Sequence, residues 1–166
     1  MEKIDLHYLN QLPERQGAAP RMMPFIPQEQ LEQFPPDWQI IEQLAAFAFA
    51  LPYVVEKPTS IAPDGSRALT LAPEYIGSHS SALMVGGEFA HIHNPPIGSM
   101  HLTLSKDVWT LALDKGWILR HPFSVMGRAS PDVVFVYAPR NSEELEWAKA
   151  LLLASYQYAL NPKYYS

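Results

Sequence analysis

The sequence predicts an α+β fold in which a mainly antiparallel sheet packs against helices. Strand-like and helix-like segments are mixed along the chain, and short links join the strand-like segments between 53 and 104. Short links are typical of antiparallel neighbours, because parallel strands need a long crossover. The 166 residues have the length of one domain and can bury a substantial core. Two predicted helices, 38–51 and 142–160, are expected to pack on the sheet and to bury its apolar face.

Three helices are predicted because apolar side chains recur at three- and four-residue spacing after a residue that can cap a helix. The helices and their caps are 38–51 after Asp37, 105–115 after Ser105, and 142–160 after Asn141. Pro52 and Gly116 are typical of the residues that follow a helix. Glu143 and Glu144 place negative charge in the first turn of the last helix, where the helix dipole stabilises it.

Strands are predicted where β-branched, aromatic and aliphatic residues cluster between turn residues. These segments are PYVVEK, ALTLA, SALMV, EFAHIH, SMHLTL, WILRH and PDVVFVYAP. The loop NPPIGS separates EFAHIH from SMHLTL and is rich in turn residues. It predicts a hairpin between these two strands.

The first 36 residues are predicted to form an extended arm, because prolines recur there too often for a helix or a central strand. Apolar residues such as Met22, Phe25 and Phe34 indicate that the arm packs on the body. Disorder is the alternative, but disordered segments are usually poor in such residues. Residues 37–166 then form the single α+β domain, and the arm is the segment through which a homo-oligomer is expected.

The composition narrows the classes of partner and location. The net charge is −5 with no basic cluster, which argues against nucleic-acid binding. The chain has no cysteine, so neither disulfides nor thiolate chemistry can contribute. No signal peptide is visible, and the longest apolar run, 44–55, contains Pro52 and is shorter than the about 20 residues of a membrane span. We expect a soluble, cytoplasmic protein without a membrane partner.

Three of the six histidines lie in the predicted hairpin, EFAHIHNPPIGSMHLTLS. His91 and His93 are two residues apart and share one face of a strand, as do His101 and Thr103. Pairing around the 94–99 loop brings cross-strand neighbours to about 5 Å. The opposite face carries only apolar residues, Ile92, Met100, Leu102 and Leu104. The hairpin therefore has one face for the core and one face of imidazoles and hydroxyls.

Clustered imidazoles allow two kinds of chemistry, and a purely structural polar layer is the alternative to both. Three neutral histidines can bind Zn, Fe, Cu or Ni, and an imidazole can also transfer protons near neutral pH. HLTLS fits the H-x-T-x-S motif of two-histidine phosphoesterases, but the chain has no second copy of it. GGEFAHIH resembles the start of a cupin metal motif, but the glutamate expected after it is missing.

The chain as a whole resembles the luciferase-like domain family, which includes the fungal luciferases. The matching stretches run from about residue 12 to 160 and are LPERQGAAPR, EFAHIH, GSMHLTLS, DKGWILRHP and VYAPRNSEELE. The resemblance implies a luciferase-like oxidase or monooxygenase that uses O2 as co-substrate and needs no organic cofactor. The fungal enzymes oxidise a hydroxypyrone, 3-hydroxyhispidin, and emit light. The membrane segment that precedes the fungal domain is expected to be absent here, and the link around SVMGRASPD is expected to differ from the fungal one.

Site residues follow from this resemblance and from the chemistry of the side chains. His91, His93 and His101 are predicted to accept the proton of an enolisable aromatic substrate and to stabilise a peroxide anion. These three histidines are predicted to project into one shared cavity. Arg140 is predicted to add a fixed charge at the rim of that cavity, unless it forms a salt bridge with a glutamate of the following helix. Residues predicted to bind or orient the substrate are Glu88, Phe89, Ser99, Thr103, Trp117, His121 and Tyr137. Glu88 is also a candidate to orient His91 or His93 through a hydrogen bond.

Two alternatives to this function stay open at the level of sequence. In the first, the three histidines bind a metal ion in a cupin-like oxygenase. In the second, the chain is a binding module for small molecules with no catalytic activity. The aromatic candidates also have a simpler role, because such residues are usually buried for packing.

Overall fold

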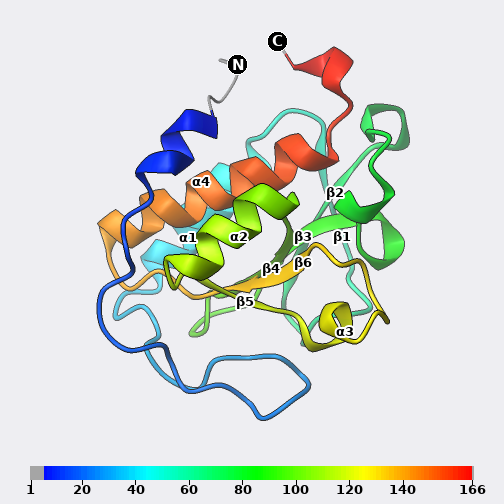
Figure 1. Ribbon diagram of the computed structural model, residues 1–166. Coiled ribbons are helices and arrows are strands. Elements are labelled where there is room, and N and C mark those ends of the chain that lie inside the picture. Colours follow the sequence, from blue (N-terminus) through cyan, green and yellow to red (C-terminus); the bar gives the residue numbers. More distant parts are fainter. Residues whose placement is uncertain (1–5, 166) are drawn as a thin grey trace.

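A six-stranded, entirely antiparallel sheet forms the centre of the computed structural model, which describes residues 6–165 (Figure 1). The strands are β1 (Val54–Lys57), β2 (Arg67–Leu71), β3 (Glu88–Ile92), β4 (Met100–Thr103), β5 (Ile118–Arg120) and β6 (Val133–Val136). Their order is β1-β2-β3-β4-β6-β5. The β3–β4 hairpin therefore lies in the middle of the sheet, and the predicted α+β class is confirmed.

Helices pack against the sheet and against each other (Figure 1). They are α1 (Gln39–Phe49), α2 (Lys106–Asp114), the single turn α3 (Pro122–Val125) and α4 (Ser142–Ala159). Five 3-10 helices complete the described secondary structure: Leu6–Gln11, Pro73–Tyr75, Ser80–Ala82, Val85–Gly87 and Pro162–Tyr164. The longest helix, α4, contacts α1, β3 and β4, so it covers the hairpin from one side.

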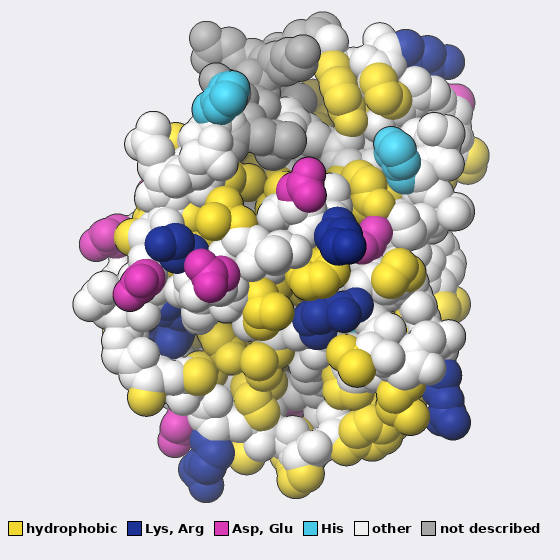
Figure 2. Space-filling model, in the orientation of Figure 1, with side chains coloured by type: hydrophobic (Ala, Val, Ile, Leu, Met, Phe, Trp, Pro, Cys, Tyr) yellow, Lys and Arg dark blue, Asp and Glu magenta, His cyan; other side chains and the backbone are white. Residues whose placement is uncertain are grey.

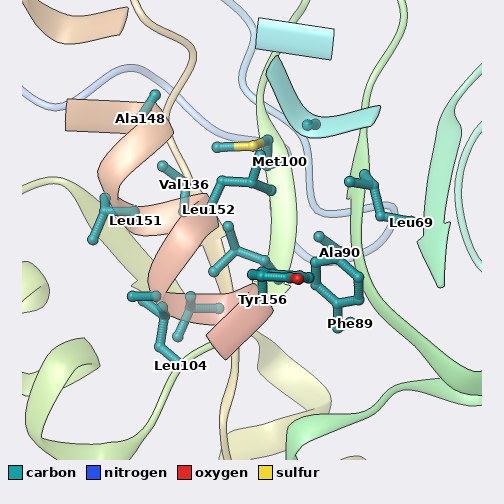
Figure 3. Close-up of a cluster of buried hydrophobic side chains, with 14 of the residues drawn as sticks. Leu69, Phe89, Ala90, Met100, Leu104, Val136, Ala148, Leu151, Leu152 and Tyr156 are labelled. Atoms are coloured by element: carbon teal, nitrogen blue, oxygen red, sulfur yellow. The ribbon is translucent and has the colours of Figure 1, made fainter. Parts of the chain in front are cut away.

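The main core lies between these helices and the sheet. Figure 3 shows Leu151, Leu152 and Tyr156 of α4 beside Met100 of β4 and Ala90 of β3. All five side chains are fully buried, at 0% relative exposure. The apolar face predicted for the hairpin is therefore the face that meets α4, and the histidines are left on the opposite face of the sheet.

The start of α4 is fixed by a side-chain cap. Asn141 is extended, and its Oδ1 accepts a hydrogen bond from the backbone N–H of Glu144 at 2.9 Å. We expect Asn141→Ala to lower the free energy of unfolding by about 1 kcal/mol, because an N–H of the first turn loses its partner. Urea denaturation measures this change, and Asn141→Asp is the matched control because aspartate keeps the accepting oxygen. Equal losses in both variants would contradict the cap as the cause.

Most predicted elements are confirmed within a few residues, and one is wrong. The segment SALMV, residues 81–85, is not a strand: it begins within the 3-10 helix Ser80–Ala82 and ends at the first residue of the 3-10 helix Val85–Gly87. Gly86 and Gly87 both have positive φ, at 76° and 80°, and turn the chain sharply just before β3. Leu83 and Met84 consequently bend over the sheet instead of pairing within it.

The N-terminal segment (blue in Figure 1) runs down one side of the body and forms the loop at the bottom of the view. Its backbone and side chains meet residues much later in the chain. Arg15 N–H donates to the Lys115 carbonyl at 2.9 Å, and Trp117 Nε1 donates to the Pro13 carbonyl at 2.7 Å. Residues 1–5 of the predicted arm lie outside the described residues.

Charged side chains on the surface are dispersed. Figure 2 shows one face of the molecule, where Lys and Arg side chains lie among acidic and hydrophobic ones. Exposed arginines such as Arg21 and Arg67 pair with the carboxylates of Glu32 and Glu56 at 3.5 and 2.8 Å. Within residues 6–165, no helix is both long and apolar enough to cross a membrane.

Candidate functional site

The three hairpin histidines converge on one face of the sheet. His91 on β3 lies directly opposite His101 on β4, and His93 follows β3 by one residue. All three side chains are buried, with 1–6% relative exposure. Their ring centroids form a nearly equilateral triangle with sides of 5.0, 5.2 and 5.4 Å. The register predicted for the hairpin is therefore the one observed.

A bulge at the start of β3 adds Glu88 to this face. Leu69 pairs with Ala90 while Thr70 pairs with Glu88, so Phe89 is an extra residue on β3. In a regular strand, residues three apart point to opposite faces. The bulge reverses that alternation, and Glu88 Oε1 lies 3.0 Å from His91 Nδ1. Glu88 thus orients His91, the role proposed for it from the sequence.

Each imidazole has one ring nitrogen held by an oxygen outside the triangle. The contacts are His91 Nδ1 with Glu88 Oε1 at 3.0 Å, His93 Nδ1 with Ser99 Oγ at 2.9 Å, and His101 Nε2 with Gln28 Oε1 at 3.0 Å. Two of these oxygens come from the hairpin itself, and the third comes from the N-terminal segment. The ring planes are therefore fixed by three separate parts of the chain.

The remaining nitrogens face the interior of the triangle. His91 Nε2 lies 3.0 Å from His101 Nδ1, whereas His93 Nε2 has no hydrogen-bond partner among residues 6–165 although it is buried. One nitrogen from each ring can be chosen so that all three lie within 4.8 Å of one another. A buried imidazole nitrogen without a partner is rare in a packed core and is typical of a site that binds something.

Burial favours neutral imidazoles at this site. It lowers the pKa of His93 to about 3, and the neighbouring His91 adds to the effect. Burial also holds the pKa of His101 well below its ordinary value, with smaller contributions from the other histidines. The pKa of His121 is lowered for the same reason. At neutral pH these three rings therefore keep a lone pair for accepting a proton or binding a metal ion.

A cavity of about 860 Å³ opens beside the histidines, a size typical of sites for small molecules. Its walls are mainly apolar and come from the N-terminal loop, the 61–63 turn, the 83–85 turn and the region of α3. The residues that line it are Ile26, Pro27, Gln28, Ile61, Pro63, Leu83, Met84, Val85, His91, His101, His121, Phe123, Arg128, Ala129, Ser130 and Val133. All three hairpin histidines were predicted to project into one cavity, but His93 is not among the described residues that line it.

His121 is brought to the site as predicted. Its ring lies 5.2 Å from that of His101 and lines the cavity. Its Nδ1 accepts a hydrogen bond from the backbone N–H of Phe123 at 3.1 Å. The neutral ring consequently carries its proton on Nε2, so His121 can donate a hydrogen bond from that nitrogen.

Arg140 is not among the described residues that line the cavity, and its predicted place at the rim is wrong. Its guanidinium binds the carboxylate of Glu144, with Nε 3.0 Å from Oε1, and donates to the Gln16 carbonyl at 2.7 Å. The pair is one turn apart, so the first turn of α4 presents a carboxylate directly to the arginine. Arg140 thus joins the N-terminal segment to α4, the salt-bridge alternative considered above.

Several other predicted substrate contacts lie away from the cavity. Tyr137 packs under Arg15, whose Cζ lies 5.0 Å from the ring centroid. Trp117 binds the Pro13 carbonyl, and the bulge turns Phe89 into the core beside Tyr156, at 6.1 Å between centroids. Thr103 shares the histidine face, but its hydroxyl donates to the Ala82 carbonyl at 2.7 Å. Each of these side chains has a packing or anchoring partner instead.

Two residues of the site were missed from the sequence. Gln28 contacts His101 and also donates from Nε2 to the Arg120 carbonyl at 3.1 Å. Phe135 lies opposite His101 on β6, with its ring 5.2 Å from that imidazole. The polar run QEQ between prolines was the available signal for Gln28, but nothing in the sequence gives its distance from the hairpin.

Comparisons with known proteins relate this chain to luciferases. Residues 86–155 match the model of the Luciferase domain family, and this stretch contains all four clustered histidines. The chain is 29% identical over 170 residues to luciferases of Armillaria gallica and Armillaria ostoyae, and 28% identical over 174 residues to that of Neonothopanus nambi. Each alignment covers 93% of this chain and 63% of the relative.

The chain thus spans somewhat less than two thirds of the length of these curated relatives. No solved structure matches it. The resemblance to the luciferase-like domain family predicted from the sequence is confirmed by the family match and by these relatives.

Proposed function

We propose that this protein catalyses a luciferase-like oxidation, in which O2 reacts with a small aromatic compound that can form an enolate, such as a hydroxypyrone. The observation that carries the proposal is the cluster of buried histidines beside an apolar cavity of about 860 Å³. The apolar walls suit a flat aromatic ring, and the imidazoles suit the acidic enol. Similarity to proteins named luciferase supports the same reaction class.

The proposed reaction begins with removal of the enolic proton. An imidazole at the cavity accepts this proton, and the electron pair stays on the substrate as an enolate. The enolate carbon then forms a bond to one oxygen of O2 and supplies both electrons of that bond. The product is a peroxide anion on the substrate, which the Nε2–H of His121 can stabilise by a hydrogen bond.

Oxygen uptake with a panel of hydroxypyrones tests this function. We expect consumption of O2 in proportion to the compound added, and none with the corresponding methyl ethers, because they have no enolic proton to lose. Light emission is recorded in the same experiment, since the reaction can occur with or without it. Tight binding of the hydroxypyrones without O2 uptake would instead indicate a binding module and contradict the proposed catalysis.

A further inference from the structure

We infer that His91, His93 and His101 bind one divalent transition-metal ion at the inner end of the cavity. The inference concerns the site of the proposed function and deepens it, but metal binding can be measured without any substrate. It rests on three observations: the positions of the inner nitrogens, the contacts of the outer nitrogens, and the composition of the ligand set.

The first observation is convergence. One nitrogen of each ring lies within 4.8 Å of the other two, and the closest pair, His91 Nε2 and His101 Nδ1, is 3.0 Å apart. Around a tetrahedral ion with bonds of 2.0–2.1 Å, ligand nitrogens lie roughly 3.3 Å apart. The widest separation must therefore shorten by at most about 1.5 Å. His93 Nε2 has no hydrogen bond to lose in that movement.

The second observation is that every ring is already held from behind. Histidines that bind metals almost always use their other nitrogen to contact a carboxylate, carbonyl or similar oxygen, which fixes the ring orientation. Here those oxygens belong to Glu88, Ser99 and Gln28, at 2.9–3.0 Å. A polar layer of histidines that only stabilised the fold would be expected to pair its inner nitrogens as well, whereas His93 Nε2 has no hydrogen-bond partner among the described residues.

The third observation is the ligand set itself. Three imidazoles without a carboxylate favour Zn, Fe, Co, Ni or Cu, whereas Mg and Ca prefer oxygen ligands. His91 and His101 line the cavity, so the open side of the ion would face a bound substrate. When bound, such an ion supplies Lewis-acid stabilisation to an enolate oxygen.

The test is titration of the chelator-treated protein with Co²⁺ and Zn²⁺, followed by visible absorption and calorimetry. We expect saturation at one ion per chain and Co²⁺ absorption bands typical of nitrogen ligation. In His93→Ala the affinity should fall at least about a hundredfold, and in Gln28→Ala about 10–100-fold, as for loss of an outer contact. His79→Ala is the matched control, because His79 is an exposed histidine beside Tyr158 and should bind the ion like the wild type.

A folding defect in a variant does not leave the inference untested. In NMR spectra of the wild-type protein, added Co²⁺ should broaden the ring signals of His91, His93 and His101 at lower concentration than those of His79. Absence of saturable binding in the wild type, or equal affinity in His93→Ala, would overturn the inference. Oxygen uptake by metal-free protein would show that the reaction does not need the ion, and the proposed function would stand. Saturable metal binding without any O2 uptake would support the metal site and contradict the proposed function.

Discussion

Replacing His101 by alanine is expected to reduce O2 consumption at least about a hundredfold, because the variant loses an imidazole that serves the reaction either as an acid–base group or as a ligand of the inferred metal ion. His101 contacts His91 and Gln28 and also lines the cavity. Oxygen uptake at saturating hydroxypyrone measures the effect. Circular dichroism should show that the sheet persists, since the apolar face of β4 is unchanged.

The control for this prediction is the same substitution at His79. That side chain is exposed and lies 5.4 Å from the ring of Tyr158, outside the cavity. His79→Ala should therefore retain the wild-type rate. If His101→Ala also retained the rate while staying folded, the histidine cluster would have only a structural role and the proposed mechanism would be wrong.

Substitution of Leu102, the residue after His101, should lower stability and leave the catalytic rate of the folded protein nearly unchanged. Leu102 is fully buried on the core face of β4, and Leu102→Ala is expected to lower the free energy of unfolding by about 2–5 kcal/mol. The loss has two sources, the apolar surface no longer buried and the cavity left between the sheet and the helices. Chemical denaturation measures it, and below the midpoint the rate per folded molecule should change little.

An exposed leucine provides the comparison for this second prediction. Leu113 on α2 is 39% exposed, so Leu113→Ala should change stability by about 0.5 kcal/mol or less. Similar losses at Leu102 and Leu113 would show that the hairpin does not separate a core face from a functional face. Together with His101→Ala, these variants test whether the two faces of one strand carry different tasks.

Local patterns were sufficient to predict most of the fold. The alternation in MHLTL predicted which face of β4 is apolar, because an antiparallel strand between a core and a second layer must follow the two-residue repeat. Asn141 was predicted as a cap from its residue type and its place before an amphipathic segment. The positive φ of Gly86 and Gly87 was not visible in the pattern of SALMV, so the strand predicted there was wrong.

The candidate site was only partly predictable from the sequence. Some of its residues are far apart in the chain, and some predicted residues have other possible partners. The cluster of His91, His93 and His101 follows from the period of two and the hairpin loop. Gln28 lies 73 residues from His101, and no periodic pattern links positions that far apart. Arg140 could have faced the cavity or paired with a glutamate of the following helix. It pairs with Glu144, whose carboxylate is only four residues away in the sequence. The aromatic residues predicted to contact the substrate pack elsewhere in the protein, because an aromatic ring can be buried in the core as readily as in a substrate pocket.

The contacts of the N-terminal segment impose an order of events on a chain that is made from its first residue onward. Gln28 needs His101 and Arg120, and Gln30 accepts a hydrogen bond from the backbone N–H of Ala138. The N-terminal segment therefore has no complete docking surface until the chain has been synthesised as far as Ala138. Closure of the histidine site by Gln28 likewise requires that the chain through Arg120 has been made.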